Sequence, residues 1–101
     1  MLFRDSSLKK IDLSASKITS LRYNLFKYAN NLEEVVLPES LTTIEFGAFS
    51  GCENLKRVNF PAGLTTIAYD AFKGCSSLEE IDISGVTSIA SGAFEGCGSL
   101  K

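Results

Sequence analysis

The chain has 101 residues, of which 45% are hydrophobic and 22% are charged, and its formal net charge is −2. This length has room for a single domain, the apolar content excludes a disordered tail, and the charge leaves no basic stripe for binding a nucleic acid. No apolar run approaches the roughly 20 residues that cross a bilayer, and the absence of histidine removes the commonest general base and metal ligand.

A unit of 22 to 24 residues repeats along the chain, and each copy starts at a leucine. The starting residues are Leu8, Leu32, Leu55, Leu78 and Leu100. A period of this length predicts a solenoid, which presents an extended surface instead of an enclosed pocket. We assign residues 1–7 to the end of a preceding partial repeat, four repeats to 8–31, 32–54, 55–77 and 78–99, and residues 100–101 to the start of a fifth.

Each repeat is predicted to begin with a strand and to continue, beyond a corner, with a second short extended segment. Apolar residues at the first, fourth and sixth places of the first segment, many of them β-branched, indicate parallel strands with one face on a core. These strands are predicted at 8–13, 32–37, 55–60 and 78–83, and the second segments at 18–21, 41–44, 64–67 and 86–89. Pro38 and Pro61 lie between the two segments, where their fixed φ suits a corner.

The third side of each repeat is predicted to be a turn. The turns begin at residues favoured by helix N-caps or by left-handed backbone, namely Asn24, Gly47, Asp70 and Gly92. We therefore expect one short helical or 3₁₀ turn in each repeat. Each turn also carries a phenylalanine, and the four are expected to stack as an internal spine: Phe26, Phe49, Phe72 and Phe94. Three glycines that follow, Gly51, Gly74 and Gly96, are expected to close the turns with positive φ.

Together these residues resemble the BspA-like leucine-rich repeats. The resemblance rests on Leu-x-x-Ile/Val-x-Leu/Phe-Pro, then Leu-Thr-Thr-Ile, then Ala-Phe-x-Gly-Cys, and it covers nearly the whole chain. It implies a leucine-rich repeat solenoid of the α/β class, mostly β: a right-handed coil with a parallel sheet on its concave face, and short strands and 3₁₀ or helical turns on the other sides. It also implies a cell-surface or secreted protein with an adhesive role towards host matrix proteins or other microbes. The first repeat departs from the pattern at 14–16 and 27–29.

Exposed positions of the first strands carry charges whose sign alternates from repeat to repeat. The second positions are Lys9, Glu33, Lys56, Glu79 and Lys101, and the third positions are Lys10, Glu34, Arg57 and Glu80. In an in-register stack each cation would lie beside carboxylates, an arrangement that contributes about 0.2–1 kcal/mol per opposed pair. The candidate partner-binding residues on this concave face are Lys10, Asp12, Glu34, Val36, Arg57, Asn59, Glu80 and Asp82. The alternative is a solvated face whose charges only neutralise one another.

Three cysteines occupy one position in successive repeats: Cys52, Cys75 and Cys97. Stacked neighbours could come within disulfide range, yet three cannot all pair internally. A free cysteine that fills the space behind the glycine as a compact hydrophobe is favoured over a redox or zinc site, because neither histidine nor a CxxC spacing is present.

Two other columns have competing interpretations. The Thr/Ser pairs of the second segments form a hydroxyl ladder. Strand propensity and hydrogen bonding within the ladder are favoured as the reason for this row, and ice or carbohydrate binding is the alternative. The tyrosines Tyr23, Tyr28 and Tyr69 fall in the turns, where covering neighbouring repeats is favoured over contact with a partner.

The sequence therefore predicts a non-enzymatic protein-recognition module with no catalytic residue, cofactor or metal, because it contains neither a nucleophile elbow nor a phosphate loop. The alternative is an intracellular scaffold or a structural spacer. A cytoplasmic location would follow if Met1 is the native start, because residues 1–5 lack the basic and apolar regions of a signal peptide. The ends carry no recognisable cap, so head-to-tail self-association is a further expectation.

Overall fold

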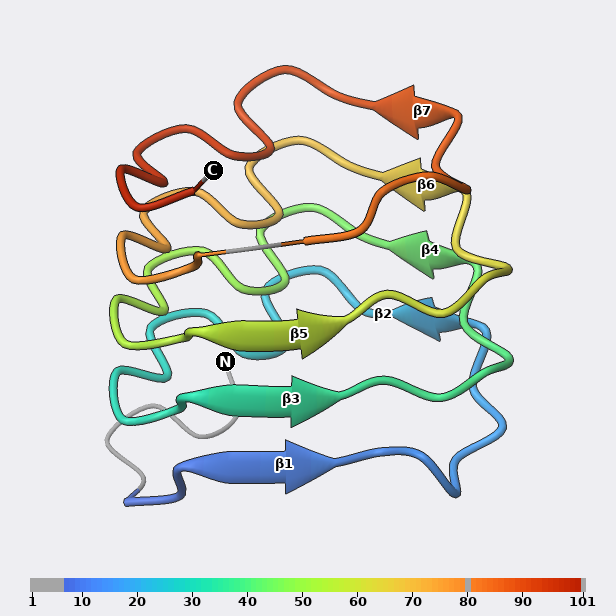
Figure 1. The fold of residues 1–101 in the computed structure, drawn as a ribbon, viewed down its shortest axis with the longest axis horizontal. Coiled ribbons are helices and arrows are strands. Elements are labelled where there is room, and N and C mark those ends of the chain that lie inside the picture. The colour runs from blue at the N-terminus through green and yellow to red at the C-terminus, as the bar shows by residue number, and fades with distance from the viewer. Residues whose placement is uncertain (1–6, 80, 101) are drawn as a thin grey trace.

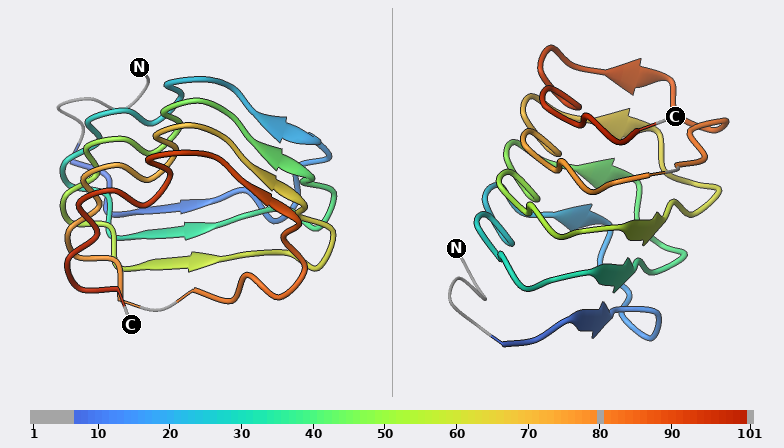
Figure 2. Two further views of the ribbon diagram at one scale, coloured as in Figure 1. Left: turned by 90° about the horizontal axis from the view of Figure 1, so that it is seen from above. Right: turned by 60° about the vertical axis from the view of Figure 1, so that its left-hand side comes forward.

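The computed structural model describes residues 7–79 and 81–100. In these ranges short strands wind into a β-solenoid with two parallel sheets (Figure 1). The first sheet has the order β1 (Lys10–Asp12), β3 (Glu34–Val36), β5 (Arg57–Asn59). The second has the order β2 (Ser20–Leu21), β4 (Thr43–Ile44), β6 (Thr66–Ile67), β7 (Ser88–Ile89). The fold is the predicted leucine-rich repeat solenoid, with stacked turns as its third side (Figure 2).

Strand pairing confirms the predicted register between repeats. In the first sheet Lys10 pairs with Glu34 and Glu34 with Arg57. In the second sheet the Thr/Ser column is paired in the same way, from Ser20 through Thr43 and Thr66 to Ser88. Each strand of the first sheet has one inward residue between two outward ones, as in the pattern around Val35 and Val58. A slip by one residue would turn these valines out of the core, so burial fixes the register.

The strand predicted at 78–83 is not formed in the part of it that the structure describes, residues 78–79 and 81–83. Leu78 is buried, but Ile83 is 38% exposed, whereas Leu37 at the same place in the second repeat is 1% exposed. Residues 81–83 follow β5 in the stack but do not pair with it as a strand. The first sheet therefore ends at β5 among the described residues.

The turns are irregular, and the expectation of a short helical or 3₁₀ turn in each repeat is wrong for the described residues, which include no helix. Along each of the first three turns, one backbone N–H donates within its own turn and the following one donates to the turn of the next repeat. Lys27 donates to Asn24 within its own turn, but Phe26 donates to Ala48 and Tyr28 to Ser50 in the next repeat. This alternation interrupts the consecutive bonds that a helix needs. Accordingly, the described chain has no helix that could cross a membrane.

Left-handed backbone makes this alternation possible. The first turn positions all have positive φ, including the non-glycine residues Asn24 at 56° and Asp70 at 57°. The predicted positive φ of the closing glycines is confirmed at 77 to 79°. In the first repeat Tyr28 takes this role with φ of 62°, a conformation that favours glycine. The departure of the first repeat from the sequence pattern therefore leaves the turn geometry intact.

The core lies inside the coil, and the predicted phenylalanine spine runs through it. Ring centroids of the four spine residues are 5.3, 5.0 and 5.3 Å apart in chain order, with interplanar angles of 19, 12 and 5°. Phe49 and Phe72 have no exposed surface. Leucines and isoleucines of both sheets, such as Leu55 and Ile44, pack around the spine and are fully buried.

A column of free thiols lies next to the spine. Cys52 and Cys75 are buried and Cys97 is partly buried, which confirms the structural interpretation of these residues. Each Sγ donates to the carbonyl oxygen of a spine phenylalanine in the preceding repeat, at 3.1, 3.1 and 3.2 Å. Burial raises the pKa of all three thiols, that of Cys52 to about 12. Thiols held protonated in this way are poor nucleophiles.

Shortening Phe49 to alanine should destabilise the fold by about 3–5 kcal/mol, because a cavity would open in the middle of the spine. Urea unfolding followed by circular dichroism measures the loss. Phe46→Ala is the matched control, since Phe46 is 50% exposed and its loss should change the unfolding free energy by less than about 0.5 kcal/mol. Equal losses in both variants would contradict the proposed spine.

The thiol column predicts a loss of stability in alkali. Above the ordinary thiol pKa of 9.0 the unfolded chain ionises while the buried Cys52 stays protonated up to about 12, so the unfolded state gains stability as the pH rises. The unfolding free energy should fall between pH 9 and 11, measured with urea under reducing conditions. In a variant with alanine at all three cysteines, the unfolding free energy should fall less steeply with pH, because only other groups then contribute to its pH dependence. Parallel curves would show that the thiols are not responsible.

Candidate functional site

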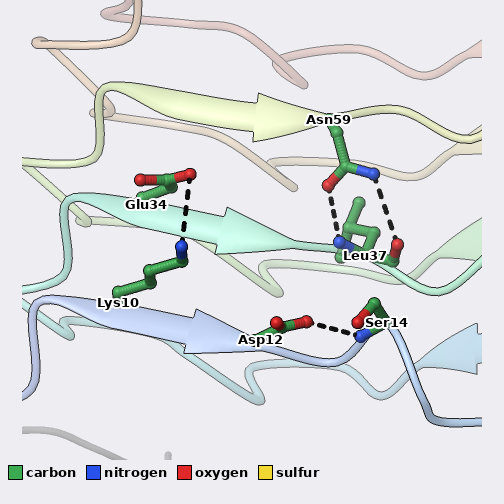
Figure 3. A network of polar contacts seen from close by, with 6 residues as sticks. All are labelled: Lys10, Asp12, Ser14, Glu34, Leu37 and Asn59. Carbon is green, nitrogen blue, oxygen red and sulfur yellow. Dashed lines mark hydrogen bonds and ion pairs between the residues drawn. The ribbon is translucent and has the colours of Figure 1, made fainter.

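The structure brings six of the eight predicted partner-binding residues onto one sheet, which we call the sheet face: the outward surface of β1, β3 and β5. Figure 3 shows Lys10, Asp12, Glu34 and Asn59 on it. Strand register places them in two rows. The first row is Lys10, Glu34 and Arg57, and the second is Asp12, Val36 and Asn59. Asp82 is exposed beyond β5, and Glu80 lies outside the described residues.

Charges alternate across the sheet face as predicted, but they interact weakly. Lys10 Nζ lies 4.0 Å from Glu34 Oε2, and their side chains are 58% and 36% exposed. Of the described residues, Lys10 and Glu34 form the sheet's one ion pair within that distance. An exposed pair of this kind contributes about 0–1 kcal/mol. The alternation therefore prevents repulsion between adjacent strands more than it holds them together.

Asp12 of the second row and Asp82 beyond β5 make turns within their own repeats. The backbone N–H of Ser14 donates to Asp12 Oδ1 at 2.8 Å, and that of Ser84 donates to Asp82 Oδ1 at 3.0 Å. The hydroxyl of Ser14, followed by its N–H, lowers the pKa of Asp12, and the N–H of Ser84, followed by its hydroxyl, lowers that of Asp82. Both carboxylates stay charged at neutral pH, and each accepts the N–H of the serine two residues later, which shapes the corner there.

Asn59 joins two repeats through its side chain. Its Oδ1 accepts a hydrogen bond from the Leu37 N–H at 2.6 Å, and its Nδ2 donates to the Leu37 carbonyl oxygen at 3.3 Å (Figure 3). One repeat earlier, the N–H of Leu13 donates instead to the backbone oxygen of Val36 at 2.8 Å. The Asn59 amide thus takes over a backbone contact at the end of the strand and is held in place by both of its polar groups.

A groove of about 650 Å³ lies on the sheet face over β3 and β5. Four predicted residues line it: Glu34, Val36, Arg57 and Asn59. Two residues that were not in the predicted set, Lys56 and Glu79, also line it. Both stand at the charged second position of their repeats, which the sequence showed. The sequence did not show that this position borders the groove. The groove has an apolar floor at Val36. Along the stack its charged residues are acidic in the second repeat, at Glu34, basic in the third, at Lys56 and Arg57, and acidic in the fourth, at Glu79.

The hydroxyl ladder of the second sheet is used within the structure. From the second repeat on, the threonine at the second place of the segment donates its hydroxyl to the carbonyl oxygen of the threonine one repeat earlier. These bonds run from Thr42 to Thr19, Thr65 to Thr42 and Thr87 to Thr65, at 3.0, 3.3 and 3.3 Å. The prediction of a hydrogen-bonded ladder is thus confirmed for this column. These hydroxyls reinforce the stack.

Exposed aromatic residues form a column on the turn side of the coil. Tyr23, Phe46 and Tyr69 stand at the same place in successive repeats and are 62%, 50% and 61% exposed. The prediction that the tyrosines cover neighbouring repeats is wrong for Tyr23 and Tyr69, whose rings project into solvent. It holds for Tyr28, whose ring occupies the space next to Gly51. Sequence reasoning missed Phe46, although its spacing of 23 residues from both tyrosines gave the signal.

No candidate metal site accompanies these surfaces in the described part of the chain. There, no three potential ligands among cysteines and carboxylates lie close enough to hold a metal ion. The two surfaces offer contact area, hydrogen-bonding groups and charge.

The solved structures that are similar to this chain include three leucine-rich repeat proteins. A leucine-rich repeat protein from Bacteroides ovatus is 36% identical, with a TM-score of 0.84 over 93% of this chain and 24% of that one. A T. pallidum leucine-rich repeat protein is 29% identical, with a TM-score of 0.70 over 82% of this chain and 50% of that one. A leucine rich cell surface protein from Faecalibacterium prausnitzii is 28% identical, with a TM-score of 0.66 over 94% of this chain and 31% of that one.

The chain thus spans half or less of the length of these solved chains. No curated protein matches it. The family model described as BspA type leucine rich repeat region (6 copies) matches residues 1–101. Stacked strands, a phenylalanine spine and in-register turns agree with that match along the described chain. The protein belongs to the BspA-type leucine-rich repeat family.

Proposed function

We propose that this chain is a non-enzymatic recognition segment of a cell-surface protein and that it binds another protein through the sheet face. The observation that carries the proposal is the groove over β3 and β5, where Val36 is bordered by charged residues of both signs. An apolar floor with a polar border is the usual composition of a protein-binding patch. Because the backbone of the groove is fixed by parallel pairing, it loses little freedom when a partner binds.

The cell-surface location is supported by family and by one structural neighbour. The similar protein from Faecalibacterium prausnitzii is described as a leucine rich cell surface protein. A surface solenoid meets large ligands, and its repeats extend the binding area along the stack. Proteins of the extracellular matrix are therefore the partner class that we propose.

Charge reversal in the groove tests this function. Glu34→Lys combined with Glu79→Lys would replace both acidic levels that flank Lys56 and Arg57, and should weaken binding at least about tenfold through lost complementarity. The measurement is surface plasmon resonance against a panel of immobilised extracellular matrix glycoproteins at physiological salt. Circular dichroism should stay unchanged, because both side chains point away from the core.

The matched control reverses two exposed carboxylates away from the groove, Glu39→Lys with Glu53→Lys, and changes the net charge by the same amount. It should keep the affinity of the original chain. Equal weakening in both variants would mean that net charge, not the groove, governs binding. Failure of the folded original chain to bind any glycoprotein of the panel would refute the proposed partner class.

A further inference from the structure

A second concave site lies on the turn side of the coil, separate from the sheet face. This flank pocket has a volume of about 320 Å³, and its side chains include Lys27, Tyr28, Phe46, Ser50 and Lys73. They come from three successive turns, which the backbone bonds between turns hold in register. The volume lies at the lower end of the range for small-ligand sites, so the pocket is sized for one compact group.

Two ammonium groups give the flank pocket its charge. Lys27 and Lys73 occupy the same place two repeats apart, with Ser50 between them. Lys27 Nζ lies 5.2 Å from the centre of the Tyr28 ring. Lys73 Nζ lies 4.0 Å from Glu95 Oε2 in an ion pair whose side chains are 50% and 64% exposed, so a ligand can compete for it.

The acidic residue of the flank pocket is directed towards the next turn. Asp70 Oδ1 lies where a side chain on Gly92 would stand, 2.5 Å from the position of a Cβ atom there. Its carboxylate therefore leans along the stack, towards the fourth repeat. This arrangement favours an anionic group over a cationic one beside Lys27 and Ser50.

Aromatic rings supply the apolar part of the flank pocket. Phe46 is 50% exposed, and the Tyr28 ring lies against Gly51 with 42% of its own surface exposed. The exposed rings of Tyr23 and Tyr69 continue the aromatic column on either side of Phe46, along the axis of the solenoid. Flat apolar rings in a periodic row suit a ligand that has flat apolar faces and itself repeats.

We propose that the flank pocket binds a carboxylated sugar ring of an acidic polysaccharide. The C–H face of the ring packs against Phe46 and Tyr28, its carboxylate accepts hydrogen bonds from Lys27 and Lys73, and a ring hydroxyl bonds to Ser50. Neighbouring sugars extend over the exposed tyrosines. An acidic peptide offers the carboxylate without the flat apolar face, so the rings favour the sugar.

Titration with oligogalacturonate, followed by chemical shifts of the turn residues, tests the proposal. We expect binding that weakens at least about tenfold in Phe46→Ala and in Lys27→Ala with Lys73→Ala, because each variant removes one of the two kinds of contact. Lys56→Ala on the sheet face is the control and should bind as the original chain does. Circular dichroism checks that each variant is folded, which the exposure of these side chains favours.

Three outcomes would overturn the proposal. The first is that oligogalacturonate does not bind. The second is that a neutral galactose oligomer binds as tightly as oligogalacturonate. The third is that polyglutamate binds as tightly as oligogalacturonate and that Phe46→Ala leaves its affinity unchanged. The last outcome would assign the pocket to acidic peptides. The double reversal of Glu34 and Glu79 should leave sugar binding intact, so failure at the sheet face and failure at the flank pocket can be told apart.

Discussion

Backbone hydrogen bonding between successive repeats is the constraint on which the rest of this structure depends. It operates on all three sides of the coil. The two sheets pair strand to strand, and the turns are joined by bonds such as those from Phe49 N to Ala71 O and from Gly51 N to Lys73 O, both 2.7 Å. Neighbouring repeats are thereby held at the strand spacing of about 4.8 Å, and each place in the repeat becomes a column of residues in contact.

Columns of this kind limit which residues can follow one another. Phenylalanine can follow phenylalanine because parallel rings stack at about the spacing that the backbone imposes. The first turn position cannot repeat a larger residue, because the side chain of Asn24 fills the space over Gly47, and that of Asp70 the space over Gly92. The alternation of larger residues with glycine is therefore steric. The alternation of charge on the sheet face has an electrostatic cause, because like charges in adjacent strands would repel.

The same columns produce the two candidate surfaces. On the sheet face, register places Val36 beside Asn59 and sets acidic and basic residues on successive levels of one groove. On the turn side, it places exposed rings in a row and two lysines on either side of a serine. Neither surface is a deep cavity, because repetition extends each of them along the stack. In the described chain, the spine and the buried thiols fill the interior.

The sequence alone determined the features that follow from period and polarity. A period near 23 residues predicted the solenoid, inward apolar places predicted both sheets and their register, and recurrent phenylalanines predicted the spine. Tertiary contacts decided the remainder. The first three turns lack a helix because alternate N–H groups, such as that of Phe26, find their acceptors in the next repeat, a partner that local propensity does not include. The groove, the tie from Asn59 to Leu37 and the exposed ring of Phe46 depend on which side chains meet across repeats and which are left uncovered, and only the folded stack settles that.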